Sequence, residues 1–440
     1  MGSFIQVTVP TKNYNETKYV FHCLLTEFLG YEYEIVSKSD VDDFVLQVGS
    51  KKIVIANHYF SNDKLYTKET IPKSVQDSPI EIDILSYPLV SLFGDNQIEI
   101  TDQLIHINSD IIASTFFMLT RWEEYVIEVR DAHDRFDVKS ALANKFNFLN
   151  RPIVNEYVDV LQALLSNIGY KGNRKNRRYE VVPTHDVDTP YMWNSTKSVL
   201  RSLAHSTLKK PSWYEFSNKV KCLVKNKDPF DTHDYFMDLS DAAGVKSNFF
   251  FLCGGSTKYD NRYDINSPRI KKLLKHIQSR GHCIGIHPTY DSYNNLDMLS
   301  SEIRSLKLAS SQEVNIGRHH YLRFSIPDTW RIWEANEMKW DSTLSYAGKS
   351  GFRCGVCYSY PVYDIVNRKQ LRLREKPLIA MEVSIVQYEN LSPSECKGRL
   401  EQLKNEVRKH NGEFVFLWHN SSFATDQWKD YDSVLKFMYT

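Results

Sequence analysis

The sequence predicts an α/β protein in two parts, a smaller α/β domain over residues 1–170 and a (β/α) barrel or parallel sheet over residues 179–440. A chain of 440 residues is too long for one ordinary hydrophobic core, which favours two domains. From residue 179 onward, strand-like and helix-like segments alternate, as they do in folds built on a parallel sheet. Residues 171–178 form a basic run with glycine and asparagine, typical of a solvated linker between domains.

Hydrophobic spacing predicts the elements of the first part. Apolar residues at helical intervals predict a helix over 19–28, and two short apolar runs predict a hairpin of strands 44–48 and 53–56. Longer apolar stretches predict helices over 111–125 and 152–165, the second with a proline in its first turn. No motif in this part indicates a particular chemistry.

The second part contains five predicted strands and five predicted helices in alternation. In parallel α/β folds the functional residues gather at the carboxyl ends of the strands, so those positions matter most. The predicted strands are 179–183, 247–252, 282–286, 377–383 and 413–418, and the predicted helices are 232–243, 268–280, 296–310, 329–336 and 394–409.

Composition narrows the class of partner and the compartment. Lys and Arg total 55 against 54 Asp and Glu, so the whole chain presents no basic field for nucleic acid or anionic lipid, although a local patch is compatible with that balance. The first residues lack the basic start and apolar run of a secretory signal, and no stretch approaches the roughly 20 apolar residues of a transmembrane helix. Seven cysteines, an odd number, do not suggest a disulfide framework. A soluble cytoplasmic protein with a weakly charged small substrate is therefore expected.

Four strand exits carry carboxylates or imidazoles. Asp186 and Asp188 follow the first predicted strand, and His287 follows the third. The adjacent pair His319–His320 lies near a further strand exit, and His419 follows the last strand. Each residue alone is explained as well by a structural role, since an Asp pair caps helices and a lone histidine is often a core residue. Together, at separate strand exits, they indicate a convergent acid–base or metal site.

The Asp186–Asp188 spacing suits a divided role. Residues i and i+2 at a strand end point to the same side, so one carboxylate can bind a metal ion while the other accepts a proton. The same pair also matches the Asp-x-Asp of glycosyltransferases, which holds a metal and a nucleotide diphosphate. For His319 and His320, neighbours on a strand face opposite ways, so at most one of them is expected in the site.

These residues resemble the polysaccharide deacetylases, carbohydrate esterase family four, over roughly residues 180–420. The resemblance implies a distorted (β/α) barrel, with Asp186 as general base, Arg318 as the arginine that orients it and His419 as general acid. It also implies Asp188 and His287 as ligands of a divalent metal ion, with zinc expected and cobalt, nickel or manganese as alternatives. The motifs that carry it are 184–188, 249–252, 281–287, Arg318, 340–342 and 417–419.

Two departures from the family pattern bear on the metal site. The second histidine that the family places four residues after the first is here Asp291, and the segment after Arg318 lacks the family's proline and glycine. Asp291, through oxygen, or His320, through nitrogen, is the candidate third ligand. If neither binds, only two protein ligands remain. For the substrate, Trp340 and Asp341 match a segment that borders the family's pocket, and Trp340, Tyr358 and Tyr360 are candidates to stack on a sugar ring.

The segments 121–125 and 351–355 resemble those of two-domain members associated with bacterial surface-polysaccharide gene clusters. The resemblance therefore implies a hydrolase that removes an acyl group, acetyl in the first instance, from an N-acetylated sugar, either nucleotide-linked or lipid-linked. A catalytically silent sugar-binding or scaffold protein is the first alternative, motivated by the missing histidine. An Asp-x-Asp glycosyltransferase is the second, and it leaves His287 and His419 without a role.

Overall fold

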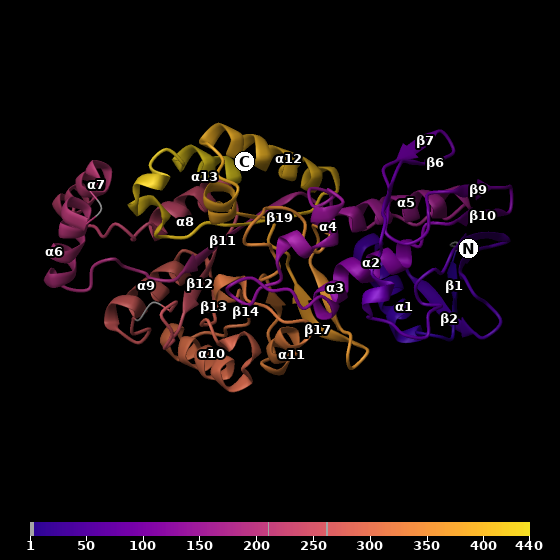
Figure 1. Cartoon of the computed structure of the whole chain (residues 1–440), viewed down its shortest axis with the longest axis horizontal. Coiled ribbons are helices and arrows are strands. Elements are labelled where there is room, and N and C mark those ends of the chain that lie inside the picture. Colours follow the sequence, from indigo (N-terminus) through magenta and orange to yellow (C-terminus); the bar gives the residue numbers. More distant parts are fainter. Residues whose placement is uncertain (1–3, 210, 261–262) are drawn as a thin grey trace.

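The computed structural model describes residues 4–209, 211–260 and 263–440, and it contains two main sheets arranged along the long axis of the molecule (Figure 1). A six-stranded sheet has the order β2-β1-β3-β4-β10-β9, and a nine-stranded sheet has the order β16-β17-β15-β14-β13-β12-β11-β19-β18. Most buried apolar side chains of both regions belong to one continuous cluster. The two regions therefore share a core rather than touching at a small interface.

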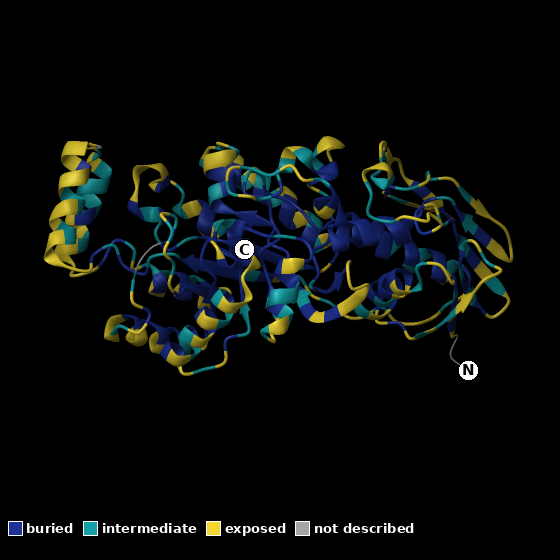
Figure 2. Cartoon of the chain, turned by 60° about the horizontal axis from the view of Figure 1, so that its bottom comes forward, coloured by how far each residue is buried: buried dark blue, intermediate teal, exposed yellow. Residues whose placement is uncertain are grey.

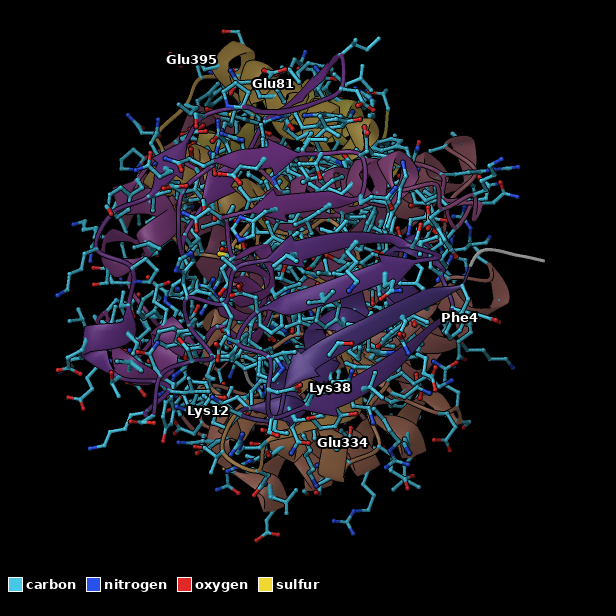
Figure 3. The ribbon with its side chains drawn as sticks, turned by 90° about the vertical axis from the view of Figure 1, so that its right-hand side faces the viewer. Phe4, Lys12, Lys38, Glu81, Glu334 and Glu395 are labelled. Atoms are coloured by element: carbon cyan, nitrogen blue, oxygen red, sulfur yellow. The ribbon has the colours of Figure 1, made fainter. Side chains whose placement is uncertain are left out.

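The six-stranded sheet belongs to the N-terminal region, and Figure 3 views it from the side away from the larger sheet. The predicted hairpin is confirmed, because β3 and β4 pair antiparallel around Gly49, whose φ of 61° suits glycine. The predicted helix over 19–28 is formed by α1 and a π-helical continuation, His22–Leu29. The strands are β1 (Ile5–Pro10), β2 (Tyr33–Lys38), β3 (Phe44–Val48), β4 (Lys51–Ile55), β9 (Ile98–Ile100) and β10 (Leu104–Ile107), and the helices are α1 (Tyr14–Phe21), α2 (Ile111–Thr120), α3 (Trp122–Val126) and α5 (Ile153–Asn167).

The helix predicted over 111–125 is broken at Arg121. This residue has a left-handed φ of 53° and separates α2 from α3. Its buried guanidinium lies 2.9 Å from Glu124 and donates to the Tyr346 hydroxyl, while Arg353 donates to the same Glu124 at 2.9 Å. The segments 121–125 and 351–355 thus meet in a buried ion network that joins the two regions, where loss of one partner would leave an uncompensated charge.

The segment over 171–178 contains no helix or strand except its border with β11, yet it is not freely solvated. Arg174 lies 2.6 Å from Asp159, and the Arg177 guanidinium stacks 4.1 Å from the ring centre of Tyr358. Arg177 also donates to the carbonyl of Glu27 at 2.7 Å. The basic side chains therefore fasten the segment to both regions. The domain boundaries at 170 and 179 remain a prediction.

The nine-stranded sheet confirms the α/β class but differs from the expected barrel. Eight of its strands are parallel, and only β16 runs antiparallel, beside β17. Among the residues that the structure describes, no strand pairing joins the edge strands β16 and β18, so the sheet is open. Three of its strands have only two residues, which leaves few hydrogen bonds to close a ring. The strands are β11 (Glu180–Val187), β12 (Asn248–Leu252), β13 (Cys283–His287), β14 (Ile316–Gly317), β15 (Trp340–Asp341), β16 (Tyr360–Asp364), β17 (Lys369–Glu375), β18 (Ala380–Met381) and β19 (Glu413–Leu417).

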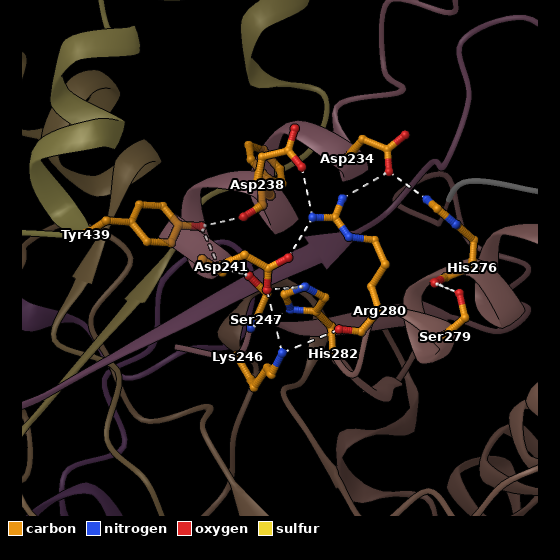
Figure 4. A network of polar contacts seen from close by, with 12 residues as sticks. Asp234, Asp238, Asp241, Lys246, Ser247, His276, Ser279, Arg280, His282 and Tyr439 are labelled. Atoms are coloured by element: carbon orange, nitrogen blue, oxygen red, sulfur yellow. Dashed lines mark hydrogen bonds and ion pairs between the residues drawn. The ribbon is translucent and has the colours of Figure 1, made fainter. Parts of the chain in front are cut away.

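The five helices predicted in the second part are confirmed to within two residues. Between α8 and the end of α9 lies a surface network of charged side chains (Figure 4). In this α8–α9 surface network, Arg280 pairs with Asp234, Asp238 and Asp241, and His276 lies 2.6 Å from Asp234. The helices are α8 (His233–Ala242), α9 (Pro268–Ser279), α10 (Leu296–Ser310), α11 (Asp328–Ala335) and α12 (Pro393–Lys409), with α13 (Asp432–Met438) at the end of the chain.

A helical hairpin that the sequence patterns did not predict stands between β11 and α8. It comprises α6 (Thr196–Ala204), the π-helical turn His205–Lys209 and α7 (Trp213–Val224). Figures 1 and 2 show it projecting from the end of the molecule opposite the six-stranded sheet. Within the described part of the chain, none of the helices has both the length and the apolar character needed to cross a bilayer.

Candidate metal centre

Three side chains converge at the carboxyl edge of the nine-stranded sheet. Asp188 directly follows β11, His287 is the last residue of β13, and His320 comes shortly after β14. The Nε2 atom of His287 lies 3.2 Å from Asp188 Oδ1 and 3.0 Å from His320 Nδ1, which in turn lies 3.4 Å from Asp188 Oδ1. Parallel strands of one sheet thus deliver two nitrogens and one oxygen to a single point.

Hydrogen bonds fix which nitrogen of each imidazole carries the proton. The Nδ1 atom of His287 lies 2.7 Å from the carbonyl oxygen of Arg318, and the Nε2 atom of His320 lies 3.0 Å from that of Tyr259. A carbonyl oxygen only accepts, so both of these nitrogens donate and the facing nitrogens of the neutral rings carry lone pairs. The buried Asp188 Oδ1 also lacks a hydrogen-bond partner. With both rings neutral, three electron-pair donors therefore face one another, and a cation bound between them would satisfy all three.

This donor set fits a divalent cation of the zinc type. Zinc accepts histidine nitrogen and carboxylate oxygen at about 2.0–2.2 Å, which places tetrahedral ligand atoms roughly 3.3–3.6 Å apart. The observed separations of 3.0, 3.2 and 3.4 Å are close to that range. Burial raises the pKa of the Asp188 carboxyl, but the neighbouring His320 and His287 outweigh burial and hold that pKa well below its usual range. Three protein ligands leave a position for water or substrate, as in catalytic sites.

The chain around β14 explains why His320 rather than His319 reaches the cluster. Gly317 lets β13 and β14 approach closely, because a Cβ there would overlap the carbonyl oxygen of Ile286. His319 points into the core, where its Nε2 accepts a hydrogen bond from Trp333 Nε1 at 2.6 Å. After His320 the chain turns sharply through Tyr321 and Leu322, with left-handed φ angles of 60° and 55°. Such a conformation costs free energy in residues other than glycine and is held by its surroundings.

Asp186 lies on β11 two residues before Asp188 and has a different partner. Its Oδ1 accepts a hydrogen bond from Arg318 Nη1 at 3.0 Å. Arg318 is fully buried and is held in turn by Ser342, whose carbonyl and hydroxyl accept hydrogen bonds from Nε at 2.8 Å and Nη2 at 3.0 Å. The guanidinium fixes the orientation of the Asp186 carboxylate beside the three donor atoms.

His419 and Glu382 form a second acid–base pair. His419 Nδ1 lies 2.6 Å from Glu382 Oε1, which also accepts from the His419 backbone at 2.8 Å and from the Ser422 hydroxyl at 2.9 Å. Burial lowers the pKa of the His419 imidazole, but the Glu382 carboxylate raises it to about 10. The sequence patterns did not single out Glu382. It lies at the carboxyl end of the strand predicted over 377–383, and that position could have revealed it.

A cavity of about 420 Å³ unites these groups. Asp186, Asp188, His287, His320 and His419 all line it, so five residues expected from the sequence lie around one space. Two further lining residues come from the N-terminal region and were not anticipated. Those residues are His133 and Arg135. Two hydrogen bonds hold their segment to the larger region: Arg323 donates to the His133 carbonyl at 2.9 Å, and Arg135 donates to the Tyr321 carbonyl at 3.1 Å. The N-terminal region therefore contributes a wall of the cavity.

Asp291, one of the two candidate third ligands, is not part of the cluster. Its carboxylate is more than half exposed and accepts a hydrogen bond from Arg323 at 3.0 Å. The Asp291 carboxylate is therefore already paired with the Arg323 guanidinium, a cation within the protein. Between Asp291 and His320, the structure brings only His320 to Asp188 and His287.

The four expected substrate-binding residues do not line the cavity either. Tyr358 and Tyr360 are buried, and their hydroxyls donate to the carbonyls of His410 and Leu119 at 2.6 and 2.9 Å. Trp340 packs against Phe250, with ring centres 5.8 Å apart. Asp341 is fully buried, where it accepts a hydrogen bond from the Thr343 backbone at 3.0 Å and shapes the turn that carries Ser342 beneath Arg318. These residues support the fold, and the aromatic side chains at the cavity are instead Tyr259, Tyr321 and Tyr388.

Comparison with known proteins identifies a partial family match and distant structural similarity. Residues 5–170 match the model of a family of unknown function, DUF7033. No curated protein matches the sequence. The structure is similar to a protein described as a polysaccharide deacetylase from Mycobacterium smegmatis, with 15% identity over 60% of this chain and 83% of that one and a TM-score of 0.38.

Two further similarities are of the same kind. A protein of Pseudomonas aeruginosa, also described as a polysaccharide deacetylase, shares 12% identity over 62% of this chain and 89% of its own, with a TM-score of 0.38. A pseudoenzyme of carbohydrate esterase family four from Bacillus anthracis shares 11% identity over 59% and 60% of the two chains, with a TM-score of 0.28. All these TM-scores are below 0.5, so the similarity to these proteins is distant.

Proposed function

We propose that the chain is a metal-dependent hydrolase that removes an acetyl group from an N-acetylated sugar during surface-polysaccharide biosynthesis. One observation carries the proposal: a triplet of converging ligand atoms from Asp188, His287 and His320 shares a cavity with an arginine-held carboxylate and a carboxylate-held histidine. Amide hydrolysis needs these parts, since it requires a stabilised nucleophile, a base that takes its proton and an acid that protonates the leaving nitrogen.

Asp186 is the base in this proposal. When water attacks the amide carbonyl, the Asp186 carboxylate takes the proton that water loses. Arg318, 3.0 Å from that carboxylate, donates a hydrogen bond to it and fixes its orientation. A divalent cation held by Asp188, His287 and His320 would supply Lewis-acid chemistry, polarising the carbonyl and making water easier to deprotonate.

His419 is the acid. The proposal requires its imidazole to be protonated at neutral pH, and Glu382 raises the pKa of His419 to about 10, which satisfies that requirement. With Nδ1 bonded to Glu382, the other nitrogen is free to give its proton to the departing amine. The carbon–nitrogen bond then breaks, leaving a carboxylate and a free amino sugar. A neutral amine leaves far more readily than an amide anion.

The cavity suits a sugar residue in size and character. Its volume of about 420 Å³ falls in the range of small-molecule sites. Tyr259 and Tyr321 offer aromatic surface on which a sugar ring can stack, and Arg135 adds a cationic side chain at the wall. We propose a substrate whose sugar is attached to a nucleotide or a lipid carrier, with the carrier outside the cavity.

The two alternatives are less well supported by the geometry. A silent sugar-binding protein was motivated by the absent histidine at position 291, but His320 supplies an imidazole nitrogen to the cluster by another route. An Asp-x-Asp glycosyltransferase would use both carboxylates of Asp186 and Asp188 on one ion. Here Asp186 is bonded to Arg318, and only Asp188 faces the histidines.

The test combines metal analysis with acetate release. The full chain is loaded with zinc or cobalt, dialysed and analysed for bound metal, then incubated with free, nucleotide-linked and lipid-linked N-acetyl sugars. We expect about one ion per chain and equal amounts of acetate and free amine from one substrate class. A chain that retains no divalent ion yet binds the sugars would support the silent sugar-binding alternative.

A further inference from the structure

The helical hairpin of α6 and α7 exposes an unusual number of apolar side chains. Six of the eighteen exposed large hydrophobic residues in the described chain fall within the 25 residues 200–224. The most exposed are Leu208, Trp213 and Val224, with 80%, 81% and 83% of their surface accessible. None of the apolar residues of the hairpin is buried, and Figure 2 shows it standing apart from the buried core. Apolar surface gathered in this way, rather than scattered, indicates a contact surface.

These residues follow helical spacing. Trp213, Val220 and Val224 of α7 are seven and eleven positions apart, or about two and three turns, so they lie on one face. In the preceding arm, Leu200 and Leu208 are separated by eight positions, again about two turns. Each arm therefore carries an apolar stripe along its outside.

The same segment is strongly basic. Residues 196–227 contain eight Lys and Arg against one Glu, a net charge of +7, whereas the whole chain has a net charge of +1. The remainder of the chain must therefore total −6. The near-neutral charge of the whole chain thus includes a local basic patch on this hairpin. Lys221 and Lys225 lie next to the apolar stripe of α7.

We propose that the α6–α7 hairpin docks the protein onto an anionic lipid bilayer. A basic helix pair with an apolar stripe and a tryptophan is the kind of element that lies in the headgroup region, where lysines meet lipid phosphates and the apolar side chains enter the acyl boundary. Nucleic acid would use the charge but leave the exposed leucines and valines in water. A second copy of the chain would meet the same positive charge on itself, which disfavours a hairpin-to-hairpin dimer.

The hairpin is also tied to the cavity. Its chain leaves β11 at Asp188, and the Tyr214 hydroxyl of α7 donates to the carbonyl of Phe423, four residues after His419, at 3.3 Å. Between its arms, the buried Lys219 ammonium donates to the Ser202 carbonyl at 3.1 Å. Docking would thus hold the cavity close to a bilayer. Lipid binding itself does not depend on the proposed hydrolase activity.

Vesicle binding by the full chain tests the proposal. Protein is sedimented with vesicles of phosphatidylcholine alone or with phosphatidylglycerol at roughly one third of the lipid. We expect binding only to the anionic vesicles, weakened by salt. Replacement of Leu208, Trp213 and Val224 together by serine should weaken it about tenfold or more, and Lys221→Gln with Lys225→Gln should do the same. The matched control, Ile84→Ser with Leu308→Ser, removes equally exposed apolar residues elsewhere and should bind normally.

A second measurement avoids reliance on the folding of these variants. Brominated acyl chains should quench part of the tryptophan fluorescence of the unaltered chain on anionic vesicles, and that part should vanish in Trp213→Phe. The proposal is overturned if anionic vesicles are not bound, if the triple serine variant binds them as well as the parent, or if the hairpin substitutions instead abolish binding to an oligonucleotide or a concentration-dependent dimer. Metal loading and acetate release, measured on the same samples, separate these outcomes from failure of the hydrolase proposal.

Discussion

Two clusters of aspartate and histidine in this molecule use the same residue types and differ in every property that matters for binding a cation. In the α8–α9 surface network, Asp234, Asp238 and Asp241 all meet the guanidinium of Arg280, and about half of the His276 side chain is exposed. At the carboxyl edge of the sheet, Asp188 faces two imidazoles whose other nitrogens already donate to carbonyls. The surface network contains its own cation.

The comparison shows what distinguishes a metal site from a salt-bridge cluster. Both contain aspartate and histidine side chains in polar contact, but among the described residues only Asp188, His287 and His320 bring three ligand atoms within 4.8 Å of one another. What differs is whether the electron pairs of the cluster are already met by donors within the protein, and whether water can reach those that are not. In the surface network, Arg280 pairs with all three aspartates, and water can reach these side chains. Asp188 Oδ1, by contrast, is buried without a hydrogen-bond partner. The four predictions below test this distinction, from the largest expected effect to the smallest.

Removing a donor from the buried cluster should abolish metal binding. For Asp188→Asn, His287→Ala or His320→Ala, we expect zinc after loading and dialysis to fall from about one ion per chain to almost none, because two protein ligands hold zinc poorly. Mass spectrometry of the metal content measures this. Asp291→Asn is the matched control and should retain the ion, since Arg323 occupies that carboxylate. Metal loss in Asp291→Asn with retention in His320→Ala would reverse the assignment of the third ligand.

Asp186→Asn should separate binding from turnover. The amide can still accept the hydrogen bond from Arg318, but it cannot take a proton, so we expect normal zinc content and acetate release slower by roughly 10²–10⁴-fold. The kcat for acetate release on the best substrate measures the effect. Unchanged turnover would exclude Asp186 as the base.

Glu382→Gln should move the alkaline limit of activity. The protonated form of His419 is present below its pKa, which Glu382 raises to about 10, so activity should persist at neutral pH and fall as pH rises through that value. Without the carboxylate the pKa returns toward the ordinary value near 6.5, and the fall should shift to lower pH by at least about one unit. A pH profile of kcat measures this shift. An unaltered alkaline limit would show that His419 is not the proton donor.

Arg280→Ala should have the smallest effect. The network it joins is exposed, so we expect unchanged metal content and a thermal midpoint within about 3 °C of the parent. Arg318→Ala provides the contrast: it leaves Asp186 buried and unpaired and should cost roughly 3–5 kcal/mol of unfolding free energy. Thermal unfolding followed by circular dichroism compares the two. Equal losses of stability would mean that burial does not distinguish these arginines.

The sequence by itself determined the helices α8 to α12 of the larger region and which strand ends carry chemistry, but it did not predict the α6–α7 hairpin or the strands β14 to β17. The five predicted helices match the structure to within two residues, because their hydrophobic spacing is a local property. Asp186, Asp188, His287 and His419 were recognisable because strand exits in a parallel sheet share one edge. Their catalytic and ligand roles stay predictions.

Only the tertiary structure decided which side chains complete the cavity and what lies around it. It brought His320 to the cluster and paired Asp291 with Arg323, placed Glu382 behind His419, and carried His133 in from the N-terminal region. It also left the sheet open and the α6–α7 hairpin uncovered. Each of these depends on side-chain direction and on packing between segments far apart in the chain, and local periodicity contains no information about either.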